Sequence, residues 1–156
     1  MPAAAQTTVK TLTDKQAQAY KNLNIPPGNR VILCLDGGGI RGILTLQLLK
    51  SLEAAAGMPC YQFCDMVSGT STGAIIAGLM AAGNDATQIE DLYIKFVTKV
   101  FLKADFFANR FVDPPAYDKA NYREALKEQL GDMTLADACA KKRARHPDHC
   151  KRCGRQ

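Results

Sequence analysis

Two glycine-rich motifs in the first half of the chain place the tightest limits on how it folds. The first reads Asp36-Gly37-Gly38-Gly39-Ile40-Arg41-Gly42, and the second reads Gly69-Thr70-Ser71-Thr72-Gly73. Each motif follows an apolar run and precedes a segment with apolar residues at helical spacing, so each is expected to turn a strand into a helix. Two successive strand-turn-helix units predict an α/β fold with a mainly parallel sheet.

The segments around these motifs define the expected elements. Strands are predicted at residues 31–35 and 63–70, and the continuous apolar run at 31–35 is typical of a strand covered on both faces. Glycine often ends a helix, and Gly57, Gly83 and Gly131 each follow an apolar-periodic segment. Helices are therefore predicted at residues 13–24, 43–52, 72–82, 89–101 and 121–130.

Length and composition favour one modest domain with its own core. The chain has 156 residues, of which 47% are hydrophobic. Residues 1–28 are expected to form an N-terminal extension and residues 29–138 the domain. Residues 139–156 are basic, contain Cys and His and have no aliphatic side chain larger than alanine, so we expect this tail to be disordered.

The positive charge is concentrated in that tail. The chain carries a net charge of +5, but seven of its twenty Lys and Arg residues lie at 139–156 beside a single acid. Residues 1–138 therefore carry a net charge of −1, and no nucleic-acid partner is predicted for the domain.

Export and membrane insertion are not predicted. Polar residues follow Met1 too closely for the apolar core of a secretory signal, and the longest apolar stretch, residues 74–82, is about half the length that a membrane-spanning helix needs. We expect a cytoplasmic protein without a transmembrane segment. Its six cysteines are expected to be reduced thiols, because Cys34 lies in an apolar strand and Cys60 and Cys64 flank aromatic residues.

The second motif has the G-x-S-x-G form of a nucleophile elbow, in which a serine stands on a strained turn between strand and helix. Ser71 is the candidate nucleophile, and Gly69 and Gly73 would let the strand and the helix pack closely at the turn. The structural alternative is a turn whose hydroxyl groups, from Thr70, Ser71 and Thr72, cap the next helix.

The first motif offers closely spaced backbone N–H groups, which beside Ser71 would stabilise an oxyanion. It also matches the G-x-G-x-x-G fingerprint of dinucleotide-binding folds, which need an acid at the end of the next strand. Asp65 has the right separation but stands at the start of that strand, which disfavours dinucleotide binding. Asp36 is expected to support the loop, and Arg41 either lies on the surface or supports the loop and meets an anionic head group.

With D-G-G-G-I-R-G followed by G-T-S-T-G, the chain resembles the patatin-like phospholipases, lipid acyl hydrolases with a three-layer α/β fold. The likeness is strong over residues 31–82 and weaker over 130–137. It implies an acyl-enzyme mechanism with a Ser/Asp dyad, no metal or organic cofactor, and a lipid substrate at a membrane or lipid-droplet surface. Ser71 would be the nucleophile, and the oxyanion hole would use the N–H groups of Gly37, Gly38, Gly39 and Ile40.

One part of the family pattern is missing. In these relatives the aspartate base stands in a D-G-G or D-G-A motif after the elbow, but no Asp-Gly pair follows residue 73 here. We therefore expect the N-terminal part of a longer hydrolase domain with an incomplete sheet. A non-catalytic lipid-binding or partner-binding module remains the main alternative.

Two weaker functional hypotheses concern the tail. Its two histidines would follow Ser71 in the order of a serine, acid, histidine triad, but a disordered segment cannot hold a catalytic imidazole. Its thiols and imidazoles also resemble part of a zinc site, although the spacing is too short to close a tetrahedron: Cys139, His146, His149, Cys150 and Cys153.

Overall fold

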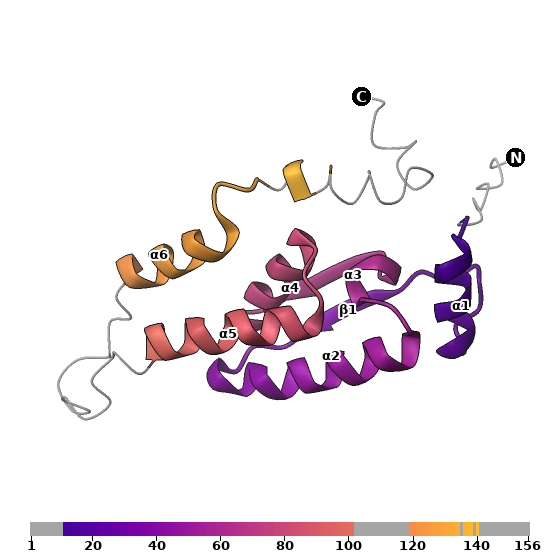
Figure 1. The fold of residues 1–156 in the computed structure, drawn as a ribbon, viewed down its shortest axis with the longest axis horizontal. Coiled ribbons are helices and arrows are strands. Elements are labelled where there is room, and N and C mark those ends of the chain that lie inside the picture. The colour runs from indigo at the N-terminus through magenta and orange to yellow at the C-terminus, as the bar shows by residue number, and fades with distance from the viewer. Residues whose placement is uncertain (1–10, 102–118, 135, 139, 141–156) are drawn as a thin grey trace, which may run out of the picture.

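The computed structural model describes residues 11–101, 119–134, 136–138 and 140 (Figure 1). A small parallel sheet is covered on one face by helices, two of which directly follow the glycine motifs. In chain order the elements are α1 (Asp14–Asn22), β1 (Ile32–Leu35), the 3-10 turn η1 (Gly39–Arg41), α2 (Gly42–Ala56), α3 (Cys60–Phe63), β2 (Met66–Gly69), α4 (Thr72–Ala82), α5 (Ala86–Phe101) and α6 (Lys119–Leu130).

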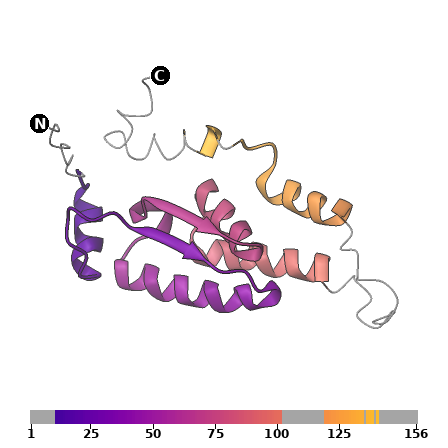
Figure 2. The same cartoon turned by 180° about the vertical axis from the view of Figure 1, so that it is seen from behind.

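The two strands pair in parallel, with Ile32 opposite Met66 and Leu35 opposite Gly69. Helices lie behind the strands in Figure 2, where the other face of the sheet is open to the viewer. On that face Ile32 and Met66 are 59% and 55% exposed. The predicted strand at 31–35 is confirmed, but its burial on both faces is not found among the described residues.

The prediction for the second strand was too long. Residues 60–63 form α3, which begins after Pro59 and places Phe63 in the core at 1% exposure. The chain becomes extended only at Cys64, where φ is −70° and ψ is 134°. A short apolar run does not by itself separate a buried helical turn from a strand, and the contact of Phe63 with the core decided in favour of the turn.

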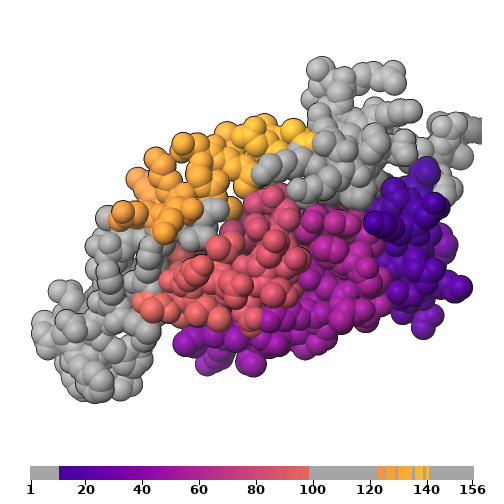
Figure 3. Space-filling model, in the orientation of Figure 1, coloured from indigo at the N-terminus to yellow at the C-terminus, as the bar shows by residue number. Residues whose placement is uncertain are grey.

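The predicted helix ends are confirmed at the glycines. Gly57 follows α2 with a φ of 73°, and Gly83 follows α4 with a φ of 97°, which is the left-handed conformation that glycine adopts without a steric penalty. The helix predicted at residues 13–24 is observed as α1, whose Thr13 and Gln16 form a capping box. Helix α1 packs against one end of α2 and α3 (Figure 3), with Tyr20 buried there.

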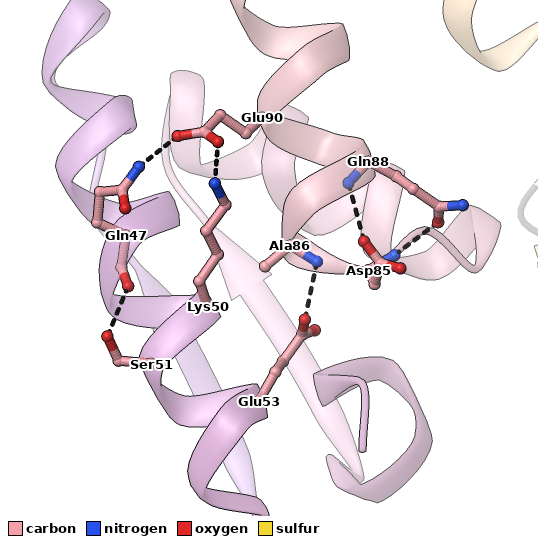
Figure 4. Close-up of polar contacts among 8 residues, drawn as sticks. All are labelled: Gln47, Lys50, Ser51, Glu53, Asp85, Ala86, Gln88 and Glu90. Carbon is pink, nitrogen blue, oxygen red and sulfur yellow. Dashed lines mark hydrogen bonds and ion pairs between the residues drawn. The ribbon is translucent and has the colours of Figure 1, made fainter. Parts of the chain in front are cut away.

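Helices α2 and α5 are joined by polar contacts at the edge of their apolar interface (Figure 4). Glu90 of α5 accepts hydrogen bonds from Gln47 and Lys50 of α2. Further along α2, the carboxylate of Glu53 accepts from the backbone N–H of Cys60 at 2.8 Å and from that of Ala86 at 3.0 Å. Glu53 therefore links the N-terminal ends of α3 and α5 to α2. The backbone N–H groups at these two helix ends favour a nearby negative charge.

Replacing Glu53 by alanine should lower the free energy of unfolding by about 2 kcal/mol, because two N–H groups of buried residues lose their acceptor. Urea denaturation measures this. Asp91→Ala, which removes an exposed carboxylate from α5, is the control and should change stability by less than about 0.5 kcal/mol. Equal effects of the two substitutions would contradict the role given to Glu53.

None of the described helices is long and apolar enough to cross a membrane. Cys34, Cys60 and Cys64 are free thiols, in agreement with the expected reduced state. The candidate zinc ligands of the tail, the two histidines and the loop at residues 113–115 lie outside the described residues. Among the residues that are described, no cluster of three potential metal ligands is present.

Candidate active site

Ser71 stands on a sharp turn between β2 and α4. Strand β2 ends at Gly69 and α4 begins at Thr72, so only two residues make the connection. The backbone of Ser71 has a φ of 53° and a ψ of −121°, a conformation that costs a non-glycine residue about 1–3 kcal/mol. The residue is exposed, so its hydroxyl is accessible from solvent. This is the strained strand-to-helix turn that the G-x-S-x-G pattern predicts.

The glycines on either side of Ser71 permit this turn. A Cβ atom on Gly73 would overlap the carbonyl group of Leu35, and a Cβ on Gly69 would overlap the backbone of Gly73. Helix α4 therefore begins in backbone contact with the ends of both strands. The surrounding backbone holds Ser71 in its strained conformation.

The first glycine motif lies directly against this turn. Because Leu35 pairs with Gly69, the two strands end side by side and the loops that follow them are neighbours. A Cβ atom placed on Gly37 would come within 2.6 Å of the Thr70 carbonyl oxygen and 2.9 Å of the Ser71 Cβ. The structure thus brings together the two motifs that the sequence separates.

The N–H groups of the glycine loop are not equivalent. The Gly38 N–H donates to Thr72 Oγ1 at 3.2 Å, and the Arg41 N–H donates to the Gly38 carbonyl at 3.2 Å. Gly39 and Ile40 begin the 3-10 turn, so the turn itself offers their N–H groups no acceptor. These two groups remain candidates for the predicted oxyanion hole.

Asp36 and Arg41 flank the loop, and both are exposed. Among the described residues no ion pair joins the two side chains, and their support of the loop stays a prediction. The aliphatic part of Arg41 lies close to Gly38, and a Cβ built on that glycine would come within 3.4 Å of the Arg41 Cβ.

Asp65 has a structural role that disfavours the dinucleotide alternative. Its carboxylate accepts the Val31 N–H at 2.8 Å and lies 3.8 Å from Arg30. Both partners precede β1, so Asp65 stands at the opposite end of the sheet from the glycine loop. The acid that would hold a ribose is therefore absent from the strand exit, where Ser71 stands instead.

Sequence reasoning missed one residue of the site, Tyr93. The apolar periodicity of α5 predicts it only as a core residue, and it is indeed fully buried. Its hydroxyl donates to the Gly39 carbonyl, and its ring occupies the space that a side chain on Gly42 would need. The glycine at position 42 was the only signal in the sequence, because a glycine can mark a close approach by another group, but it does not specify which residue approaches.

Ser71→Gly should raise the free energy of unfolding by about 1 kcal/mol. Relief of about 1–3 kcal/mol of strain exceeds the entropic cost of a glycine, about 0.5–1 kcal/mol. Thermal unfolding tests this, with Ser71→Ala as the control that keeps the strain. A Ser71→Gly protein that is no more stable than Ser71→Ala would show that the turn is not strained.

Comparison with known proteins identifies the family of the chain. Residues 33–152 match the family model of the patatin-like phospholipases, and the match includes much of the basic tail. The cUMP-AMP-activated phospholipase of Escherichia coli is 52% identical over 106 residues, which are 68% of this chain and 30% of that protein. An 85/88 kDa calcium-independent phospholipase A2 of Rattus norvegicus is 33% identical over 66% of this chain and 12% of its own length.

Phospholipase A I of Arabidopsis thaliana is 30% identical over 71% of this chain and 8% of its own length. The chain thus spans less than a third of the length of each of these three relatives. No solved structure matches the chain significantly. Because the family model covers residues 33–152, the chain belongs to the patatin-like phospholipase family.

Proposed function

We propose that this protein hydrolyses carboxylic ester bonds of lipids with Ser71 as the nucleophile. The observation that carries the proposal is the contact between the two motifs: an exposed serine on a strained turn lies against a loop whose Gly39 and Ile40 N–H groups have no acceptor within the 3-10 turn. A hydroxyl nucleophile beside backbone donors for an oxyanion is what acyl transfer requires. The family membership supports a lipid ester as the substrate.

In the proposed reaction, the Ser71 oxygen bonds to the ester carbonyl carbon, and the serine proton passes to a base. The carbonyl oxygen becomes negative and is stabilised by the N–H groups of Gly39 and Ile40 and by the N-terminal end of α4. The bond from carbon to the alcohol oxygen then breaks, and the base returns its proton to the leaving alcohol. Water attacks the acyl-enzyme in the same way and releases a fatty acid. No metal or organic cofactor takes part in these steps.

The base is the unassigned part of the mechanism. Among the described residues, no carboxylate or imidazole is hydrogen-bonded to the Ser71 hydroxyl. We infer a Ser/Asp dyad whose aspartate belongs to a D-G-G or D-G-A segment of a longer protein, since the relatives above extend far beyond the aligned region. Reading the coding DNA past codon 138 in all three frames tests this. Absence of both motifs would require the base to be one of the chain's own acids.

A fluorophosphonate probe tests the nucleophile directly. The full-length protein, which includes the inferred aspartate, should become labelled, with the adduct on the peptide that contains Ser71, and it should release fatty acid from phospholipid vesicles as a peripheral, cytoplasmic enzyme would. Vesicle binding without labelling or fatty-acid release would favour the non-catalytic lipid-binding module instead. Saturable NAD binding would support the alternative that the protein binds a dinucleotide.

A further inference from the structure

We propose that Tyr93 is a positioning residue whose hydroxyl group holds the oxyanion loop in its working orientation. The inference deepens the proposed function and rests on it. Tyr93 lies on α5, which follows both motifs in the chain, and it is fully buried. Its hydroxyl donates to the carbonyl oxygen of Gly39, a residue 54 positions earlier.

The geometry of the peptide bond explains why this contact bears on the site. The Gly39 carbonyl and the Ile40 N–H belong to the same peptide group, and no described peptide bond is cis. In a trans peptide these two groups point in opposite directions. Because Tyr93, together with the Gly42 N–H of the 3-10 turn, holds the carbonyl toward the core, the Ile40 N–H points in the opposite direction. If the peptide between Gly39 and Ile40 rotated, the Ile40 N–H would no longer point in this direction.

A second link ties the loop to the elbow itself. Thr72, the first residue of α4 and the neighbour of Ser71, is 4% exposed, and its Oγ1 accepts the Gly38 N–H at 3.2 Å. The Thr72 hydroxyl also lies close enough to Tyr93 to lower the pKa of the Tyr93 hydroxyl. Tyr93 and Thr72 therefore hold two peptide groups of the loop, 39–40 and 37–38, and Thr72 connects the loop to the turn that carries Ser71.

The environment keeps the Tyr93 hydroxyl protonated. Burial raises the pKa of Tyr93 above its ordinary value, against weaker opposing effects of the Thr72 hydroxyl and the Gly42 backbone. The group therefore remains a hydrogen-bond donor throughout the neutral pH range. A Cβ on Gly42 would overlap the Tyr93 ring and hydroxyl, which explains why the last residue of the loop is glycine.

Tyr93→Phe removes the hydroxyl and keeps the ring in the core. With short-chain ester or phospholipid substrate, kcat should fall about ten- to a hundredfold, because one oxyanion donor loses its orientation, while KM changes less than about twofold. Amide hydrogen exchange should become faster in the peptide covering residues 36–44. Both readouts distinguish positioning from a general loss of stability.

Tyr20→Phe is the matched control. Tyr20 is also buried, at 1% exposure, and its hydroxyl donates to Asn29 and Asp65, at the end of the sheet away from the loop. This control should leave kcat and exchange at residues 36–44 unchanged even if its melting temperature falls as far as that of Tyr93→Phe. Parallel losses of kcat in both variants, or unchanged kcat and exchange in Tyr93→Phe, would overturn the inference.

The two proposals can fail separately. If the wild-type protein neither hydrolyses lipid nor reacts with the probe, the proposed function fails, and the exchange measurement alone decides whether Tyr93 holds the loop. If Tyr93→Phe does not fold, Thr72→Val and Thr72→Ser replace it. Valine should accelerate exchange at residues 36–44 and serine should not; identical behaviour of these two variants would overturn the inference.

Discussion

Alanine in place of Ser71 is expected to lower kcat for lipid ester hydrolysis by about 10⁴- to 10⁶-fold, the range observed when a serine hydrolase loses its nucleophile. The hydroxyl oxygen is the only heavy atom removed, and it is the atom that would bond to the acyl group in the acyl-enzyme. Alanine keeps the strained backbone of residue 71, so the melting temperature should stay close to that of the wild type. Fatty-acid release from vesicles and fluorophosphonate labelling measure the loss.

Ser68→Ala is the control for this substitution. Ser68 lies on β2 three positions earlier, and its hydroxyl contacts Cys34 Sγ at 3.4 Å, away from the elbow. The control should retain full activity. If Ser71→Ala retained activity within tenfold of the wild type, the nucleophile would have to be another group, with the hydroxyls of Thr70 and Thr72 the first to examine.

Gly73→Ala is expected to lower the free energy of unfolding by about 3 kcal/mol or more, and to abolish activity as well. The added methyl group would overlap the Leu35 carbonyl and lie 2.9 Å from the Asp36 carbonyl oxygen. These are backbone atoms of the strand end and the loop, which cannot move aside as a flexible side chain would. Relief requires α4 to separate from the sheet, which displaces Ser71 from the glycine loop.

The same chemical change five residues later should have the opposite sign. Gly78 also lies in α4, but a Cβ there would meet only a Leu130 methyl group at 4.0 Å. Gly78→Ala should therefore stabilise the protein by about 0.5–1 kcal/mol through helix propensity. Urea denaturation of both variants measures the difference. Similar stability of the two would show that α4 does not contact the strand ends as described.

Local rules were sufficient to predict most of the described helices from sequence. The glycine after α2 and the glycine after α4 both have the left-handed conformation expected of them, because glycine is the residue that ends a helix there without strain. The strained turn at Ser71 was also predicted locally, from the G-x-S-x-G pattern. Phe63 could not be placed in this way, because a short buried helix and a buried strand have similar local sequences.

The open face of the sheet shows another limit of local reasoning. The apolar run 31–35 predicts burial on both sides, yet Ile32 is 59% exposed in the described part of the chain. Burial depends on which elements pack over the strand, and a strand's own residues do not specify those elements.

By itself, the sequence determined the two turns, because glycine spacing acts on the neighbouring backbone, and it identified Ser71 as the candidate nucleophile. Only the tertiary structure decided that Gly37 lies against Ser71, that the Gly38 N–H is engaged by Thr72, and that Tyr93 orients the peptide after Gly39. These contacts join residues 34 to 54 positions apart. Such pairings arise from strand register and helix packing, which no short segment of the chain encodes alone.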